Sequence, residues 1–389
     1  MTVLSQQQKR ILYKDQEIAL PIFLDHQSTT PLAPEVEMEM FRVLEHPGNA
    51  QSKSHVYGLY AQEIIEKARH KVARLIDAND DEIFFANSAS EANRLILFHL
   101  ASQVEGKAHF ITSEIEHSSI LKNLRSLEEN GATLTILPVD QNGKVDPGKL
   151  EKAITPKNTI VTIQAANNEI GTCQDLKVLA EICAAKGALF HTDAVQALTT
   201  RSLTVKELSL TALGLSGHKL YGPQGIGAYF LRRGYQENLK PEFEGTPSAA
   251  LIAGLGKACD LAHTNAENDN ALLLELRNRF LQPFKESQIS ENIVINGYEK
   301  DFIPGCISLT FQGIRSEDLL LEIPQIACSA GSACTSSTQE PSHILKAIGL
   351  DSARADSTVR IGLGRYVTAA EVDYAANVML EAYIKLRGL

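Results

Sequence analysis

Short apolar runs alternate with longer helical stretches between about residues 80 and 231. The apolar runs have the length of β-strands, and turn-forming residues separate them from the stretches that follow. We expect strands at 83–86, 109–112, 133–139, 159–165, 188–192 and 226–231, and helices at 91–103, 117–130 and 175–186. This alternation predicts an α/β fold with a mostly parallel sheet, helices on both faces and right-handed crossovers.

The pattern changes after about residue 265. A long helical stretch at 271–287 is followed by short strand-like runs at 293–295, 307–311 and 359–361, and by a last helix at 368–387. We therefore expect a large domain over residues 21–264 and a smaller α+β domain over 265–389, with the segment 1–30 packing on the smaller domain. A chain of 389 residues is long enough for two such cores.

Composition excludes several classes of function. The net charge of -10 argues against nucleic-acid binding, which needs a basic face. No apolar run approaches the roughly 18 residues of a membrane span, and the polar N-terminus does not resemble a secretory signal. The six cysteines form no Cys-x-x-Cys pair, so no metal site is expected, and reduced thiols in a cytoplasmic protein are the simplest interpretation.

Lys219 and Asp193 are the strongest candidates for chemistry. Lys219 ends the run Ser-Gly-His-Lys at 216–219, and Asp193 lies in His-Thr-Asp-Ala-Val-Gln at 191–196. A lysine amine and a buried carboxylate on neighbouring strand ends are what pyridoxal phosphate needs. The amine forms a Schiff base with the aldehyde, and the carboxylate keeps the pyridine nitrogen protonated. Taken singly, Lys219 could be a solvated loop lysine and Asp193 a strand-end cap.

Other polar residues follow the expected strands, where open α/β sheets bind ligands. Ala89 and Ser90 lie between a strand and a helix and could hold a phosphate, although Ser90 could simply cap that helix. His117 could lie over a cofactor ring or be an ordinary histidine. Asn168 could donate to a ring hydroxyl or belong to an ordinary turn. The glycine-rich run at 221–227 does not open a helix, so we interpret it as a tight turn.

Cys334 stands in a run of small residues at 329–338. Nothing apolar nearby would hold it in a core, so the run suits a thiol that must travel, although an ordinary linker with an incidental cysteine is also possible. Cys328 follows two apolar residues and is more typical of a structural cysteine.

Together these motifs resemble the long-loop cysteine desulfurases, the group that serves iron–sulfur cluster assembly. They belong to the class-V aminotransferases, among the fold-type-I enzymes that use pyridoxal 5'-phosphate. The resemblance runs from residue 23 to the final helix and implies a large domain with a seven-stranded, mostly parallel sheet. The matching motifs lie at 24–31, 54–55, 116–117, 167–171, 191–193, 216–219, 221–227, 331–336 and 359–365.

The resemblance implies a role for each site residue. Lys219 would bind the cofactor aldehyde, Asp193 the ring nitrogen, and Asn168 and Gln196 the ring oxygen. Ala89, Ser90, Ser216 and His218 would bind the phosphate, joined by Thr246 from the second subunit of a homodimer. Arg360 and Asn49 would hold the carboxylate of L-cysteine, His117 would move protons, and Cys334 would accept the sulfur and pass it to an acceptor or scaffold protein.

The chain departs from the family at two places. The segment 233–246 is shorter than usual and keeps only Glu244-Gly245-Thr246, which bears on the clamp between subunits. Arg94 stands where the family usually has asparagine. Two alternatives therefore stay open. One is another fold-type-I enzyme, such as a selenocysteine lyase, a transaminase or a β-lyase. The other is a non-catalytic relative that kept the fold.

Overall fold

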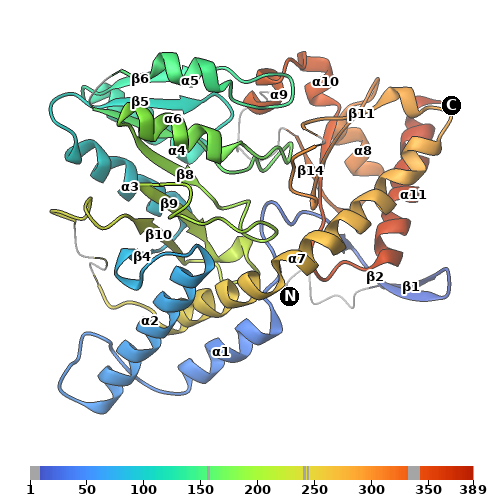
Figure 1. The fold of residues 1–389 in the computed structure, drawn as a ribbon. Coiled ribbons are helices and arrows are strands. Elements are labelled where there is room, and N and C mark those ends of the chain that lie inside the picture. The colour runs from blue at the N-terminus through green and yellow to red at the C-terminus, as the bar shows by residue number, and fades with distance from the viewer. Residues whose placement is uncertain are drawn as a thin grey trace.

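The computed structural model describes residues 9–155, 158–239, 242, 245–298, 300–331 and 342–388. Its largest sheet has seven strands in the order β4-β10-β9-β8-β7-β5-β6 (Figure 1). Only β10 runs antiparallel to its neighbours in this sheet. The predicted α/β class is therefore confirmed. The strands are β4 (Ile83–Ala86), β5 (His109–Ser113), β6 (Thr133–Leu137), β7 (Thr159–Thr162), β8 (Leu189–Asp193), β9 (Ala212–Ser216) and β10 (Gly227–Leu231).

Within this sheet, β9 is the strand that was not expected from the sequence. Its residues Ala-Leu-Gly-Leu-Ser include no β-branched or aromatic side chain, so local propensity does not favour a strand. All five residues are buried, and β8 and β10 pair with it on either side. Tertiary pairing therefore decides the conformation. The position of β9 matters, because it places the run 216–219 at a strand end.

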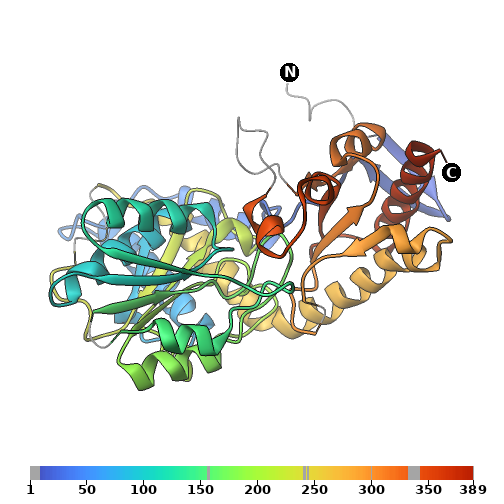
Figure 2. The ribbon, with the colours of Figure 1, turned by 90° about the horizontal axis from the view of Figure 1, so that it is seen from above.

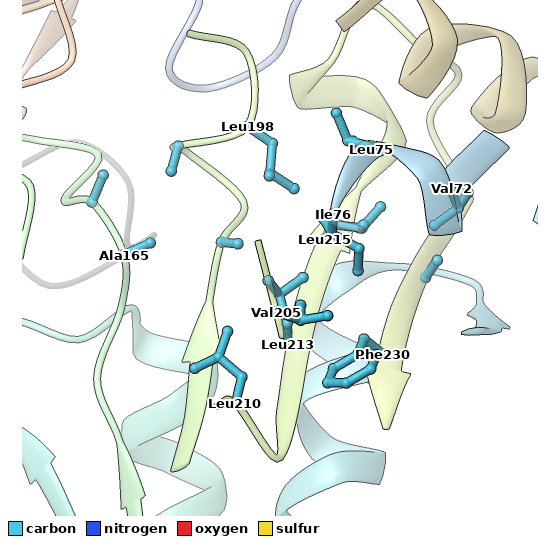
Figure 3. Close-up of a cluster of buried hydrophobic side chains, with 14 of the residues drawn as sticks. Val72, Leu75, Ile76, Ala165, Leu198, Val205, Leu210, Leu213, Leu215 and Phe230 are labelled. Atoms are coloured by element: carbon cyan, nitrogen blue, oxygen red, sulfur yellow. The ribbon is translucent and has the colours of Figure 1, made fainter. Parts of the chain in front are cut away.

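Successive residues of the central strands point to opposite faces of this sheet. One face, with Phe110 and Ile160, packs on α3 (Ala89–Gln103) and α4 (Ser118–Glu129). The other face, with Ile111 and Val161, packs on α2 (Val56–Leu75), α5 (Pro147–Ala153), α6 (Leu176–Lys186) and the first part of α7 (Ala249–Glu286). Figure 3 shows part of this second cluster around Leu213 and Phe230, and Figure 2 shows helices on both sides of the sheet.

A second core surrounds a four-stranded sheet in the order β11-β12-β15-β14. It packs against the second part of α7, α8 (Ser316–Glu322) and α11 (Ala369–Arg387). The hairpin of β1 and β2 contributes Ile18 to this core, and Tyr13 accepts a 2.8 Å hydrogen bond from Asn377 on α11. The strands are β1 (Lys9–Tyr13), β2 (Gln16–Leu20), β11 (Ile293–Ile295), β12 (Cys306–Phe311), β14 (Ser329–Ala330) and β15 (Thr358–Gly362).

Short elements complete the fold. Strand β3 (Ile22–Phe23) pairs in parallel with β13 (Ile326–Ala327). Two short helices, α9 (His343–Ala347) and α10 (Ser352–Asp356), precede β15. Helices α1 (Pro34–Leu44) and α2 were not expected from the sequence, and α1 packs against α7.

Helix α7 is continuous from residue 249 to 286 and connects the two cores (Figure 1). From the sequence a helix was expected only over 271–287, and the residues just before it, Asn265–Asn270, form a polar run. That expectation was wrong. Asp269 in this run is buried and paired with Arg365, so its polarity reflects a buried ion pair and not a loop. The expected domain boundary at 264/265 falls inside α7.

Within the described ranges, no helix is both long and apolar enough to cross a membrane. The same part of the chain holds no group of three or more His, Cys, Asp or Glu side chains arranged to bind a metal ion. It contains five of the six cysteines, and none of these five is in a disulfide. Burial raises the pKa of Cys173, Cys183, Cys306 and Cys328 to about 12, as expected for structural thiols.

Candidate active site

A cavity of about 490 Å³ lies where the strand ends of the large sheet meet the four-stranded sheet. This volume suits a small-molecule site. Its walls on one side are the loops after β4, β5, β7, β8 and β9, and on the other side β15 and the segment around α9. Many of the predicted site residues line it, namely Ala89, Ser90, His117, Asn168, Asp193, Gln196, Ser216, His218, Lys219 and Arg360.

Asp193 is held with its carboxylate at the cavity wall. Its Oδ2 atom accepts a 2.7 Å hydrogen bond from Asn93 Nδ2, and its Oδ1 atom accepts a 3.0 Å bond from the backbone N–H of Val195. Asp193 is only 8% exposed, so these two bonds stabilise a carboxylate that has little water around it. Asn93 comes from α3 and was not identified from the sequence.

Lys219 follows β9 in a short 3-10 turn, Gly217–Lys219. Its Nζ atom donates a 2.6 Å hydrogen bond to the carbonyl of Ser28 and a second, short bond to the carbonyl of Gln27. Gln196 Nε2 donates to the same Gln27 carbonyl at 3.0 Å. The loop before α1 therefore orients the amine in the cavity that Asp193 also lines.

The start of α3 forms one end of the cavity. Ser88 caps this helix, because its Oγ atom accepts the backbone N–H of Glu91 at 3.1 Å. The alternative in which Ser90 is the cap is therefore wrong, and Ser90 lies in the first turn facing the cavity. A Cβ atom at Gly227 would lie 2.9 Å from the backbone nitrogen of Ala89, so glycine lets β10 approach this turn. The helix dipole makes this end suitable for an anion.

His117 caps α4 and lines the cavity. Its Nδ1 atom accepts the backbone N–H of Ser119 at 3.2 Å, so Nε2 carries the hydrogen in the neutral ring. Desolvation lowers the pKa of His117, Asp193 opposes this shift, and Lys219 adds to it. The neutral form with a hydrogen on Nε2 is therefore favoured.

Arg360 on β15 is 2% exposed and brings a cation to the opposite wall. Its Nη2 atom donates to Asp25 Oδ1 at 2.8 Å, and its Nη1 atom donates to the carbonyl of Asn168 at 3.4 Å. Ser28 Oγ donates to the other oxygen of Asp25 at 2.6 Å. This chain of contacts fixes the plane of the guanidinium.

His218 lines the cavity beside Ser216 and Lys219. Burial, with a smaller effect from Lys219, lowers the pKa of His218 to about 4. His218 is therefore neutral near pH 7. Its Nδ1 atom lies 3.1 Å from Thr29 Oγ1. A neutral imidazole can hydrogen-bond an anionic group there without adding charge.

Two of the predicted residues that the structure describes do not join this group. Asn49 and Thr246, both described, contact each other instead, with Asn49 Nδ2 3.5 Å from Thr246 Oγ1, and neither lines the cavity. The shortened segment before Thr246 is tied to its own sheet. Glu242 binds both terminal nitrogens of Arg69 at 3.0 Å and accepts the backbone N–H of Phe85 in β4. Cys334 lies outside the described residues.

The structure adds residues that the sequence analysis missed. Ser342, His343 and Glu169 line the cavity, and Ser342 Oγ donates to Glu169 Oε2 at 2.5 Å. Glu116 lies just beneath, fully buried, and accepts bonds from Ser113 Oγ at 2.6 Å and from the backbone of Gln164. Ser342 and His343 follow no expected strand, and their contacts with Glu169 and Glu116 join segments far apart in the chain.

These donors fit pyridoxal phosphate. A buried, oriented carboxylate suits a protonated ring nitrogen, a primary amine in the same cavity suits an aldehyde, and the first turn of α3 with Ser90 and Ser216 suits a phosphate. Arg360 supplies a planar cation for a carboxylate on the opposite wall.

Comparisons with known proteins agree with this site. The aminotransferase class-V family model matches residues 22–375. The mitosomal cysteine desulfurase of Encephalitozoon cuniculi is 40% identical over 380 residues, which covers 94% of this chain and 87% of that protein. This chain belongs to the cysteine desulfurase family. The family explains why Lys219, Asp193 and Arg360 face one cavity.

Solved structures of other members support the same assignment. A NifS-like protein superposes with a TM-score of 0.84 at 29% identity, covering 95% of this chain and all of that one. SspA, solved in complex with cysteine, superposes with a TM-score of 0.75 at 31% identity, covering 89% of this chain and 100% of SspA. The desulfurase chain thus has the fold of the fold-type-I enzymes, with the smaller sheet completing the cavity.

Proposed function

We propose that this protein is a pyridoxal-phosphate-dependent cysteine desulfurase, which converts L-cysteine to L-alanine and places the sulfur on Cys334 as a persulfide. The single observation that carries the proposal is the convergence of Lys219, Asp193 and Arg360 on one cavity in a chain of this family. The cysteine bound to the related SspA supports the choice of substrate.

The chain's own residues have separate tasks in this reaction. When bound, pyridoxal phosphate supplies an electron-accepting ring that makes the Cα proton of an amino acid acidic. Asp193 holds a proton on the ring nitrogen, and Asn93 keeps the Asp193 carboxylate in place. Arg360 binds the substrate carboxylate with the bidentate geometry that lysine lacks. Lys219 takes the Cα proton, and His117 exchanges protons with the sulfur through Nε2.

We further propose that the persulfide on Cys334 passes to an acceptor or scaffold protein for iron–sulfur cluster or other thio-cofactor assembly. The support for this proposal within the chain is the position of Cys334 in a run of small residues. A thiolate at Cys334 would attack the substrate sulfur, as in thiol exchange. The cytoplasmic location stays a prediction.

We also propose a homodimer. Helix α1 exposes Met38, Phe41 and Leu44 along one side, with exposures of 64, 60 and 65%. The start of α2 adds Val56 and Tyr57, which are 71% and 53% exposed. An exposed apolar group of this kind is typical of a protein interface. Sedimentation of the purified protein would measure its mass, and a monomer at micromolar concentration would contradict the dimer.

The experiment that tests the function compares the parent with Lys219→Ala and Cys334→Ser. We expect Lys219→Ala to lose the visible absorption of the lysine-bound cofactor and all alanine formation. Cys334→Ser should keep that absorption and lose the persulfide, which mass spectrometry of the cysteine-treated protein would detect. A parent that forms no alanine from cysteine would contradict the proposal, and supplying selenocysteine or a 2-oxo acid instead would identify a lyase or a transaminase.

A further inference from the structure

We propose that His343 is a second proton acceptor of the active site, which takes one proton from bound L-cysteine and works beside His117. The proposal deepens the desulfurase function and rests on it. His343 begins α9 and lines the same cavity as Lys219 and Arg360. Its side chain is exposed at the cavity, so it can also exchange protons with water.

A hydrogen bond fixes the tautomer of His343. Its Nε2 atom lies 3.1 Å from the backbone carbonyl of Glu116. A carbonyl can only accept, so Nε2 must carry the hydrogen. In the neutral ring, Nδ1 is then the acceptor. His343 therefore brings a proton-accepting nitrogen to the site.

His117 has the opposite arrangement. Its Nδ1 atom accepts the backbone N–H of Ser119, so its Nε2 atom is the donor. The two rings are thus a matched pair in one cavity, one able to give a proton and one able to take it. Glu116 links the two histidines. Its backbone carbonyl accepts the hydrogen bond from His343, and it directly precedes His117 in the chain.

The charges around His343 come from several elements. His117 and Glu169 each interact electrostatically with His343, and all three line the same cavity. Glu169 is buried, accepts the Ser342 hydroxyl and has a pKa raised by burial. Arg360 on β15 faces Glu169, and Asp193, Lys219 and Lys122 face His117. Two further charged or titratable residues belong to these elements, Glu116, whose backbone carbonyl binds His343, and Lys346 on α9 itself.

The step conserves atoms and charge. L-cysteine reaches the site with two ionisable protons, on its ammonium and on its thiol. With the carboxylate at Arg360, Nδ1 of His343 uses its lone pair to bind one of these protons. The electron pair of the broken bond stays on the substrate nitrogen or sulfur. The imidazolium then returns the proton to water at the mouth of the cavity.

The test separates proton transfer from a purely structural role. His343→Gln can keep an N–H donor for the Glu116 carbonyl and removes the proton-accepting nitrogen, whereas His343→Phe removes both. We expect both variants to lower kcat/KM for L-cysteine about 100-fold near neutral pH and to change the shape of its pH profile. His263→Gln, an exposed histidine on α7, is the matched control and should leave the profile unchanged.

Calorimetry of ligand binding adds a readout besides turnover. Titrating parent and His343→Gln holoenzyme with L-alanine and with L-cysteine, in two buffers of different ionisation enthalpy, counts the protons released. A change in this count for both ligands assigns the ammonium proton, and a change for L-cysteine alone assigns the thiol proton. A His343→Gln variant with the parental pH profile and proton count overturns the proposal. A parent enzyme that does not turn over cysteine overturns the function itself.

Discussion

One of the two hydrogen bonds that orient Asp193 comes from Asn93, which lies 100 positions away in the chain. Asn93 is fully buried in α3, and its Nδ2 atom donates to Asp193 Oδ2 at 2.7 Å. Its Oδ1 atom lies above Gly214, where a Cβ atom would be only 2.3 Å away. Glycine in β9 therefore makes room for the side chain that holds the carboxylate.

Replacing Asn93 with alanine should weaken cofactor binding. The Asp193 carboxylate would lose a hydrogen bond in a site with little water. This loss costs roughly 1–2 kcal/mol, which corresponds to an increase of about tenfold in the dissociation constant of the cofactor. Fluorescence titration of the apoprotein with pyridoxal phosphate measures this constant. Asn130→Ala is the control, because Asn130 Nδ2 donates to the Ser126 carbonyl at the end of α4 and Asn130 does not line the cavity. Equal constants for the parent and Asn93→Ala would contradict the role of Asn93.

Sequence reasoning found the residues that follow strands and missed those that depend on tertiary contacts. Lys219 and Asp193 could be identified because their residue types and spacing suit one known cofactor. His343 could not, since its contact with Glu116 joins residues 227 positions apart. Asn49 and Thr246 show a second limit, in which the sequence names a residue that a single chain does not bring to the site. The family resemblance named both, but within one chain they contact each other and not the cavity.

At the scale of elements, α7 carries the link between the two cores. Asp269 in the middle of this helix binds Arg365, just after β15, through two nitrogens at 2.9 and 2.6 Å. The Arg365 guanidinium lies 4.5 Å from the centre of the Tyr221 ring, and the Arg365 N–H donates to the Tyr221 hydroxyl at 2.6 Å. Tyr221 is two residues after Lys219. One buried ion pair therefore connects α7, the loop of Lys219 and the strand of Arg360.

Asp269→Asn should destabilise the protein strongly. The side chains of Asp269 and Arg365 are 5% and 14% exposed, and removing one partner of a buried pair costs about 3–5 kcal/mol. The matched control lies on the same helix. Asp260 pairs with Arg74 at side-chain exposures of 26% and 45%, and Asp260→Asn should change stability by about 1 kcal/mol or less. Urea denaturation measures both, and similar losses for the two variants would argue against a special role for Asp269.

At the scale of the whole molecule, the sequence predicted the architecture because the sheet follows from alternation alone. The apolar strand β5, buried on both faces, and the amphipathic helix α4 were found at nearly their true bounds. Besides α1 and α2, the elements that were not expected include β9, which has no β-branched or aromatic residue, and the first part of α7, whose polar run contains a buried ion pair. In both, packing with distant parts of the chain outweighs local propensity.

The pH dependence of the free energy of unfolding tests whether Glu116, buried next to the cavity, is protonated in the folded protein. Burial raises the pKa of Glu116 from 4.5 to about 8, so between these values the folded protein keeps a proton that the unfolded chain has lost. Unfolding then releases a proton, and the free energy of unfolding falls as pH rises, by up to about 1.4 kcal/mol per pH unit. Buried His191 and His218, with pKa values lowered to about 3 and about 4, act in the opposite direction but only below their unfolded value of 6.5.

The window from pH 6.5 to 8 therefore isolates Glu116 from these histidines. Glu116→Gln has no proton to lose there, so its stability should vary less with pH than that of the parent. Urea midpoints measured at pH 6.5 and pH 8 for both proteins give the two slopes. Parallel slopes would mean that Glu116 is already ionised in the folded state. That result would place a buried negative charge on the residue that precedes His117 in the chain and whose backbone carbonyl binds His343.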